Sequence, residues 1–191
     1  MIWSLKNSME TLRIAIISVD GSEITETIAP LDIFRRAGIE FVTFGKDFFY
    51  HQPAREISSL METAKELEFS ALVFPGGKRG VQKVKEDILN NDIGQFVISW
   101  AKSGKLIAAI CAAPSILGEL GLLKGRKYTC YPGWQSDSFG GTYMNNSIAV
   151  DGNLITGRSM YYSTDFGLEI VEYLLGKEKR IEIEKQVKGI I

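Results

Sequence analysis

The 191-residue chain has few of the side chains that build metal sites and disulfide frameworks. It contains one histidine, His51, and two cysteines, Cys111 and Cys130. No cluster of metal ligands accompanies them, so we expect no metal site. Two cysteines without regular spacing exclude a disulfide scaffold and are typical of a protein in a reducing cytoplasm. No apolar run is long enough to span a membrane, and the N-terminus lacks the apolar stretch of a signal peptide.

An excess of charge of one sign is also missing. The chain carries 22 Lys and Arg against 23 Asp and Glu, which gives a net charge of −1. This balance provides no basic footprint for nucleic acid and no attraction to an acidic membrane surface, so we expect neither partner. Length and ordinary apolar content predict one α/β domain over residues 12–191, preceded by a flexible extension over residues 1–11.

Short apolar runs alternate with amphipathic segments along the chain, a pattern that predicts an α/β fold. The expected strands are residues 13–19, 39–44, 71–74 and 106–110. The expected helices are residues 30–37, 85–103, 116–120 and 163–175. An Asp-Gly pair within residues 150–154 predicts a tight hairpin, and residues 45–58 predict a loop with a short strand. Strands joined by helices indicate a mostly parallel central sheet that is covered on both faces.

Cys111 lies between the apolar run 106–110 and the helical pattern that follows it. A strand that turns directly into a helix leaves the corner side chain projecting, as in the nucleophile elbow of hydrolases. Ala109 and Ala113 provide the small neighbours that such a corner needs. Free N–H groups at the helix start predict a lowered thiol pKa and therefore a reactive cysteine. The alternative is an inert core cysteine, the usual state of a free thiol.

Three segments of chemical interest follow predicted strands: residues 20–27, residues 75–80 and Cys111. In open α/β sheets the carboxyl ends of the strands line the edge at which ligands bind. The first segment includes the carboxylate of Glu26, and the second includes a Gly-Gly turn whose N–H groups can approach a ligand closely. Thiolate, carboxyl and free N–H groups together predict nucleophilic attack on a carbonyl group. Alternatively, the glycines form a plain turn and Glu26 only favours a helix N-terminus.

Three motifs, within residues 23–38, 71–77 and 107–114, resemble the ThiJ/PfpI superfamily in its branch around the parkinsonism-associated protein deglycase. The resemblance covers residues 12–176. It implies a flavodoxin-like three-layer α/β sandwich with a nucleophile elbow, related to class I glutamine amidotransferases and usually found as a homodimer.

The resemblance also implies roles for particular residues. Cys111 matches the nucleophile of the superfamily, and Glu26 matches a protonated glutamate that is hydrogen-bonded to the cysteine sulfur. The backbone N–H groups of Gly77 and Ala112 match the donors of the oxyanion hole. The residues implied to line the pocket are Gly76, Tyr131, Arg158 and Met160.

Both positions at which the superfamily places a histidine near the cysteine hold other residues. The deglycase branch has histidine where this chain has Tyr131, and the protease-like branch has histidine where this chain has Ala112. This absence argues against a peptidase but leaves chemistry on aldehydes open, with Glu26 moving the proton. We interpret His51 as a surface or loop residue. Cys130 lies in a strand-like run and is interpreted as a structural cysteine, with a resolving thiol as the alternative.

We therefore expect a cytoplasmic, cofactor-independent enzyme of the glyoxalase III or deglycase type. Its substrate would be a small 2-oxoaldehyde or a glycated protein, attacked by the Cys111 thiolate to give a hemithioacetal. The alternative is a redox-sensing or chaperone-like stress protein in which Cys111 oxidises to a sulfinate. A role in thiamine-precursor metabolism, also attached to the superfamily, finds no phosphate-binding Gly-rich loop in this sequence.

Overall fold

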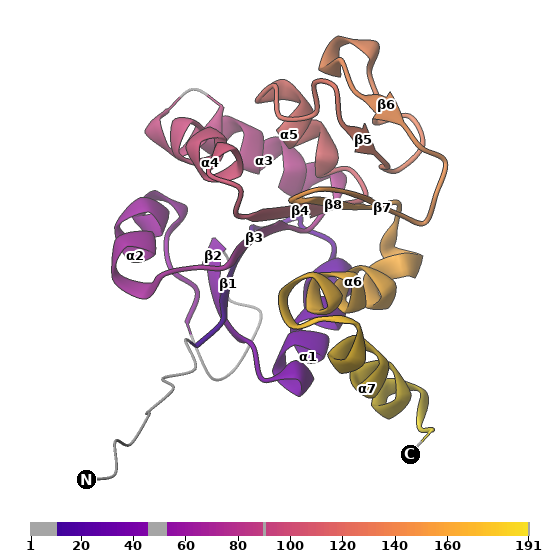
Figure 1. Ribbon diagram of the computed structural model, residues 1–191. Helices are drawn as coiled ribbons and strands as arrows, with labels where there is room; N and C mark the ends of the chain where they lie inside the picture. Colours follow the sequence, from indigo (N-terminus) through magenta and orange to yellow (C-terminus); the bar gives the residue numbers. More distant parts are fainter. Residues whose placement is uncertain (1–10, 46–52, 90, 191) are drawn as a thin grey trace, which may run out of the picture.

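A six-stranded sheet runs through the centre of the protein and carries helices on both faces (Figure 1). The computed structural model describes residues 11–45, 53–89 and 91–190. The strand order is β2-β1-β3-β4-β8-β7, and every neighbouring pair is parallel except β7 with β8. The strands are β1 (Arg13–Ser18), β2 (Glu40–Gly45), β3 (Ala71–Phe74), β4 (Leu106–Ile110), β7 (Ile148–Asp151) and β8 (Leu154–Gly157).

Side chains of the central strands alternate between two apolar cores, one on each face of the sheet. In β4, Ile107 belongs to one core and Ala108 to the other, and both are fully buried. The period of two follows from the pleat of a strand. Because both faces are covered, these strands are continuously apolar instead of alternating between apolar and polar residues.

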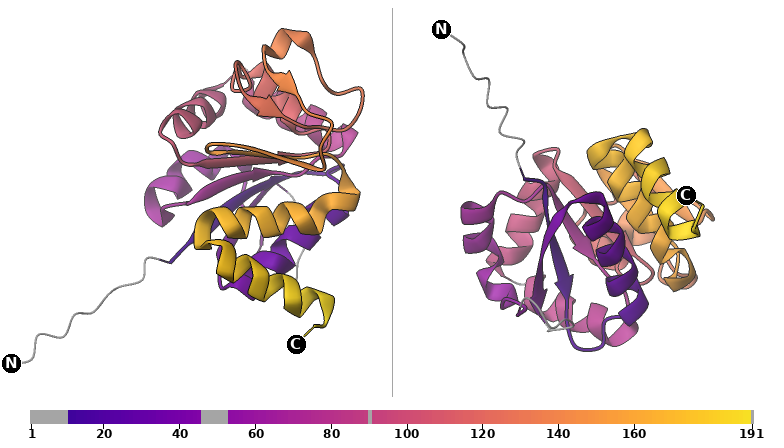
Figure 2. Two further views of the ribbon diagram at one scale, coloured as in Figure 1. Left: turned by 45° about the vertical axis from the view of Figure 1, so that its right-hand side comes forward. Right: turned by 90° about the horizontal axis from the view of Figure 1, so that it is seen from below.

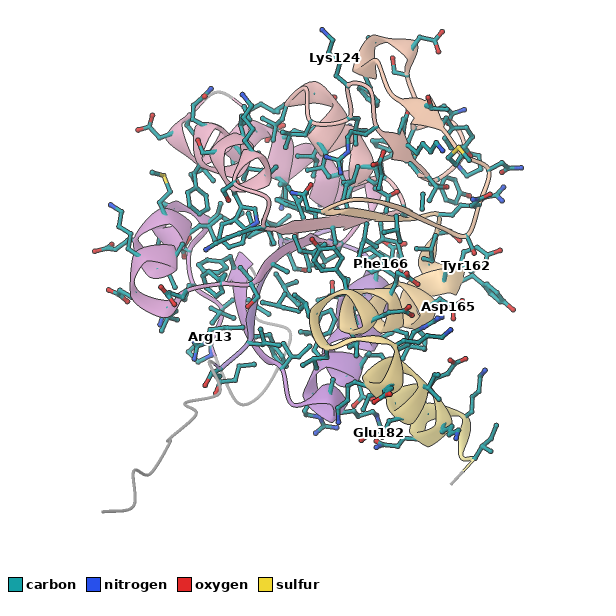
Figure 3. All side chains as sticks on the ribbon, in the orientation of Figure 1. Arg13, Lys124, Tyr162, Asp165, Phe166 and Glu182 are labelled. Carbon is teal, nitrogen blue, oxygen red and sulfur yellow. The ribbon has the colours of Figure 1, made fainter. Side chains whose placement is uncertain are left out.

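The helices divide between the two faces, as the views of Figure 2 show. One face carries α2 (Leu60–Leu67), α3 (Lys78–Ile88), α4 (Asp92–Lys102) and α5 (Pro114–Glu119). The other face carries α1 (Ile24–Ala37), α6 (Ser163–Leu175) and α7 (Lys177–Lys188). Phe166, labelled in Figure 3, lies on α6 and is buried in the second core. Shorter elements are the pair β5 (Lys127–Tyr128) and β6 (Thr142–Tyr143) and the 3₁₀ turns η1 (Ile57–Ser59), η2 (Asp137–Phe139) and η3 (Met160–Tyr162).

The predicted three-layer α/β sandwich with a mostly parallel sheet is confirmed. All four predicted strands are present within one residue of their expected ends. The predicted hairpin joins β7 to β8, and its Gly152 has a φ of 55°, the left-handed conformation that an Asp-Gly turn needs. The last predicted helix is present as α6, which ends at Gly176.

The single helix predicted over residues 85–103 is wrong, because two helices occupy this part of the chain. Helix α3 ends at Ile88, and α4 begins anew after Asn91, which has an extended backbone and accepts a hydrogen bond from the Ile93 N–H at 2.9 Å. Asparagine is among the best N-cap residues, so the break has a local cause. Helix α1 also differs from its prediction, because it begins at Ile24 and contains Pro30 in its interior.

Some expectations fall on residues outside the described part of the chain. These are His51, most of the loop predicted from residue 45, and nearly all of the predicted N-terminal extension. Within the described residues, no helix combines the length and the apolar character required to cross a membrane.

Candidate active site

Cys111 occupies a sharp corner directly after β4. Its φ of 63° lies in the left-handed region, one of two such angles recorded for non-glycine residues in the described part of the chain. A non-glycine residue in this region is strained by about 1–3 kcal/mol and persists only where its surroundings hold it. Two backbone hydrogen bonds do so: the Cys111 N–H donates to the Gly157 carbonyl at 2.9 Å, and the Tyr131 N–H donates to the Cys111 carbonyl at 2.8 Å. The predicted elbow is therefore present, and its thiol is half-buried.

Glu26 reaches the elbow from the first turn of α1. Its side chain is 1% exposed, and its Oε2 accepts a hydrogen bond from the Gly76 N–H at 2.8 Å. The Glu23 N–H donates to the Gly76 carbonyl at 2.9 Å, so the start of α1 is joined to the Gly-Gly turn twice. A Cβ at Gly76 would lie 2.6 Å from Glu26 Oε2 and 2.8 Å from Cys111 Cβ. The glycine is therefore required here by close packing.

The backbone N–H groups of Gly77 and Ala112 lie near the Cys111 sulfur and act to lower the pKa of its thiol. The sulfur also interacts with the Glu26 carboxyl. The second carboxyl oxygen, Glu26 Oε1, is buried and has no well-formed hydrogen bond to the described residues. A bare buried oxygen is costly for an ionised carboxylate, so this arrangement favours a proton on the carboxyl.

Burial raises the pKa of Glu26 to about 7, against the opposing hydrogen bonds from Cys111 and Gly76. Burial and the neighbouring Glu26 charge raise the pKa of the Cys111 thiol to about 12. The prediction of a lowered thiol pKa is wrong, because the N–H groups of Ala112 and Gly77 do not outweigh these two effects. The resting site thus holds a thiol beside a carboxyl that exchanges its proton near neutral pH.

The remaining predicted pocket residues surround the elbow through their main chain. Tyr131 bonds to the Cys111 carbonyl, and Arg158 follows Gly157, which accepts the Cys111 N–H. The side chains of Tyr131 and Met160 are about half exposed, at 48% and 49%. Their role as pocket lining stays a prediction.

Gly157 supports the elbow, a role that the sequence analysis does not predict. A Cβ at this position would lie 2.8 Å from Ile110 Cγ1, so glycine permits the close approach of β8 to the elbow. The preceding residue, Thr156, accepts the Thr129 N–H at 2.9 Å through its hydroxyl and so holds the segment that leads to Tyr131. Glycine at the end of a strand often marks a close approach of another backbone, and this is the sequence signal from which the role of Gly157 could have been predicted.

Cys130 differs from Cys111 in having no exposed surface. Burial alone raises the pKa of its thiol to about 12. Both features are typical of a structural cysteine, which was the first of the two interpretations of this residue.

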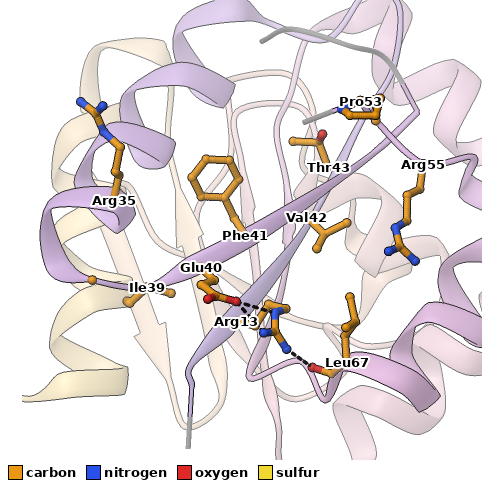
Figure 4. A pocket seen from close by; sticks show the side chains of 12 residues that line it. Arg13, Arg35, Ile39, Glu40, Phe41, Val42, Thr43, Pro53, Arg55 and Leu67 are labelled. Atoms are coloured by element: carbon orange, nitrogen blue, oxygen red, sulfur yellow. Dashed lines mark hydrogen bonds and ion pairs between the residues drawn. The ribbon is translucent and has the colours of Figure 1, made fainter. Parts of the chain in front are cut away.

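A separate hollow of about 770 Å³ lies beside the edge strand β2, toward the opposite ends of the strands from Cys111 (Figure 4). Three arginines line it, but each is already paired: Arg13 with Glu40, Arg35 with Asp32, and Arg55 with Thr63. Among the described residues, its lining includes no cysteine and no titratable carboxyl other than Glu40, which is paired with Arg13. We therefore place the candidate active site at Cys111.

The sheet order and the corner at Cys111 define a flavodoxin-like α/β sandwich with a cysteine at its elbow. The chain belongs to the DJ-1/PfpI family, whose sequence profile matches residues 12–173. It is 35% identical over 178 residues to protein dj-1beta of Drosophila melanogaster, which covers 89% of this chain and 93% of that protein. It is 32% identical over 157 residues to a protein named deglycase from Pyrococcus abyssi, with 77% of this chain and 90% of that protein covered.

Solved structures show the same relationship. The crystal structure of Drosophila melanogaster DJ-1beta superposes with a TM-score of 0.78 at 29% identity and covers 93% of this chain and 97% of that one. A mutant of a DJ-1 superfamily protein from Salmonella typhimurium superposes with a TM-score of 0.77 at 31% identity, over 94% and 97% of the two chains.

The raised pKa of Glu26 predicts that Glu26→Gln stabilises the protein at pH 8 but much less at pH 5. Between the unfolded pKa of 4.5 and the folded value of about 7, the folded state keeps a proton that the unfolded state releases. The stability of the wild type therefore falls as pH rises through this window, by about 3 kcal/mol in total. Glutamine keeps the shape and does not titrate. Urea unfolding of both proteins at the two pH values measures the difference, and a difference independent of pH would show that Glu26 has an ordinary pKa.

Proposed function

We propose that the protein is a cysteine-dependent enzyme that acts on 2-oxoaldehydes or on the adducts they form with proteins. One observation carries this proposal: a half-buried thiol shares a strained corner with a carboxyl whose pKa is about 7. A general base works best when its pKa lies near the operating pH, and Glu26 meets this condition. The deglycase name of the relative from Pyrococcus abyssi supports the same class of substrate.

The first step is addition of Cys111 to the aldehyde carbon. Because the thiol pKa is raised, the Glu26 carboxylate accepts the S–H proton as the sulfur attacks. The new C–S bond forms while the electron pair of the carbonyl moves to its oxygen. Glu26 then returns the proton to this oxygen and gives a hemithioacetal. The N–H groups of Gly77 and Ala112, which lie at the sulfur, are the proposed donors to the developing oxyanion.

The second half of the reaction needs no external oxidant. Glu26 removes the hydrogen of the former aldehyde carbon as a proton, and the resulting enediol is protonated at the neighbouring carbon. The first carbon is thereby oxidised to a thioester while the second is reduced to an alcohol. Water cleaves the thioester, so that a 2-oxoaldehyde and one water give a 2-hydroxy acid and the free thiol. With a hemiaminal adduct of a protein amine, the sulfur forms its C–S bond as the C–N bond breaks, and the thiol proton passes to the departing amine. This releases the amine and gives the same hemithioacetal, which then follows the steps above.

The proposal includes a homodimer in the cytoplasm. Membership of the DJ-1/PfpI family supports the dimer. Exposed apolar side chains near the candidate site support a partner surface there: Ile24 is 58% exposed on α1, and Tyr161 is 83% exposed on η3. The two unpaired cysteines support a reducing compartment.

Replacement of the nucleophile should abolish the reaction. We expect Cys111→Ser to reduce methylglyoxal consumption to background, because a serine hydroxyl is a far weaker nucleophile without a stronger base. The matched control is Cys130→Ala, which removes the other thiol and should leave the rate essentially unchanged. Consumption and 2-hydroxy acid formation are followed together by chromatography. Retained activity in Cys111→Ser would refute the proposal.

The rate should also follow the titration of Glu26. We expect kcat to rise as pH increases through about 7, because the base form of Glu26 is populated only above its raised pKa. Glu26→Ala should lower kcat by at least about 100-fold and remove this rise. A pH profile that is the same in both proteins would assign the proton transfers to another group.

A redox sensor is the second candidate function. The buried and unbonded Glu26 Oε1 favours it, because a protonated carboxyl at this place could donate to an oxygen atom added to the sulfur. In this chemistry peroxide transfers one oxygen to the thiolate and gives a sulfenate and water, and a second peroxide gives a sulfinate. The raised thiol pKa leaves little thiolate for this attack, so we place the sensor second.

Mild peroxide treatment separates the two functions. If the protein is a sensor, peptide mass spectrometry should find sulfinate at Cys111 and an unmodified thiol at the buried Cys130. Glu26→Ala should lower the yield of sulfinate. A Cys111 that stays reduced while methylglyoxal is consumed would exclude the sensor.

A further inference from the structure

Two basic residues directly follow, in the sequence, residues whose backbone lies against Cys111. Lys78 directly follows Gly77, whose N–H group lies near the Cys111 sulfur. Arg158 directly follows Gly157, whose carbonyl accepts the Cys111 N–H. Successive Cα atoms are about 3.8 Å apart, so each cationic side chain starts one residue away from a direct contact of Cys111.

Neither cation has an acidic partner in the part of the chain that the structure describes. This separates them from basic residues farther along α3, since Lys83 pairs with Asp20 at 3.2 Å and Lys85 pairs with Glu119. Lys78 is exposed and Arg158 is half-buried. Ammonium and guanidinium groups donate hydrogen bonds and cannot accept them. A lysine or arginine without an acidic partner can therefore bind an external anion.

The acidic groups near the elbow do not cancel these cations. Glu26 is 1% exposed and faces the sulfur, and its neighbour Glu23 is half-buried. The exposed side chains of Tyr131 and Met160 complete the surroundings and add no carboxylate. The two cations therefore outnumber Glu23, the one partly exposed carboxylate named here, although the whole chain has a net charge of −1.

We propose that the Cys111 site prefers carbonyl compounds that carry a carboxylate, which Lys78 and Arg158 bind while the carbonyl carbon meets the sulfur. The substrate class is then a 2-oxoaldehyde with a carboxylate a few carbons away, such as 4,5-dioxopentanoate. The substrate class rests on the proposed function, which supplies its reaction. The preference for anions is independent of that function, because it applies to any carboxylate that approaches the thiol.

Alkylation of Cys111 tests the charge preference without any turnover. Iodoacetate and iodoacetamide both lose iodide to the same sulfur, so the ratio of their rates is independent of the thiolate fraction. We expect Lys78→Gln with Arg158→Gln to lower the iodoacetate-to-iodoacetamide ratio by roughly threefold or more at low salt. Each single variant should give a part of this loss. In the wild type, about 0.5 M NaCl should lower the ratio in the same direction, because salt screens the two cations.

The control is Lys83→Gln, which removes an equal charge from the same helix but from a lysine paired with Asp20. This control should keep the wild-type ratio. An unchanged ratio in the double variant, or an equal loss in the control, would overturn the proposal.

Turnover of 4,5-dioxopentanoate and of its methyl ester then tests the substrate class. We expect the acid to have a kcat/KM about tenfold above that of the ester, and the double variant to remove this advantage through KM. Equal turnover of acid and ester would overturn the substrate class while the proposed function stands. If neither compound nor methylglyoxal is consumed but the alkylation ratio depends on Lys78 and Arg158, the proposed function fails and the anion preference stands.

Discussion

The carboxyl of Glu26 connects the three segments that form the candidate site. Its hydrogen bond from the Gly76 N–H, at 2.8 Å, attaches the first turn of α1 to the end of β3. The same carboxyl lies against the thiol at the end of β4. Parallel strands bring these ends to one edge of the sheet, but the buried carboxyl fixes how closely they approach. Even a methyl group at Gly76 would collide with Glu26 and with Cys111 at once.

This arrangement costs stability in two places. Glu26 is buried as an acid whose charged form lacks a bond for one oxygen, and Cys111 holds a left-handed backbone angle. Each feature costs on the order of 1–3 kcal/mol. The two apolar cores on the faces of the sheet offset these costs, because their side chains are almost completely buried. Strain that is concentrated at one edge of an otherwise regular fold is typical of a functional site.

Local patterns in the sequence predict a large part of this structure. The apolar run before Cys111 and the alanines around it predict both the strand and the corner. The sequence pattern does not predict the break between α3 and α4. Apolar residues at helical spacing continue across Asn91, so its function as the N-cap of α4 is not apparent from the sequence. The raised thiol pKa could not be predicted either. It depends on Glu26, which lies far from Cys111 in sequence, and on a degree of burial that only the packed fold determines.

In the part of the chain that the structure describes, no histidine lies beside the thiol, which is consistent with the chemistry of Glu26. In this chain the Tyr131 N–H still donates to the Cys111 carbonyl, so the segment keeps its place through the main chain and needs no imidazole. Glu26, with a pKa of about 7, changes protonation near neutral pH. Burial thus gives a carboxyl the pH range in which histidine ordinarily titrates. In the proposed mechanism this allows one residue both to accept the proton of the thiol and to return it to the substrate.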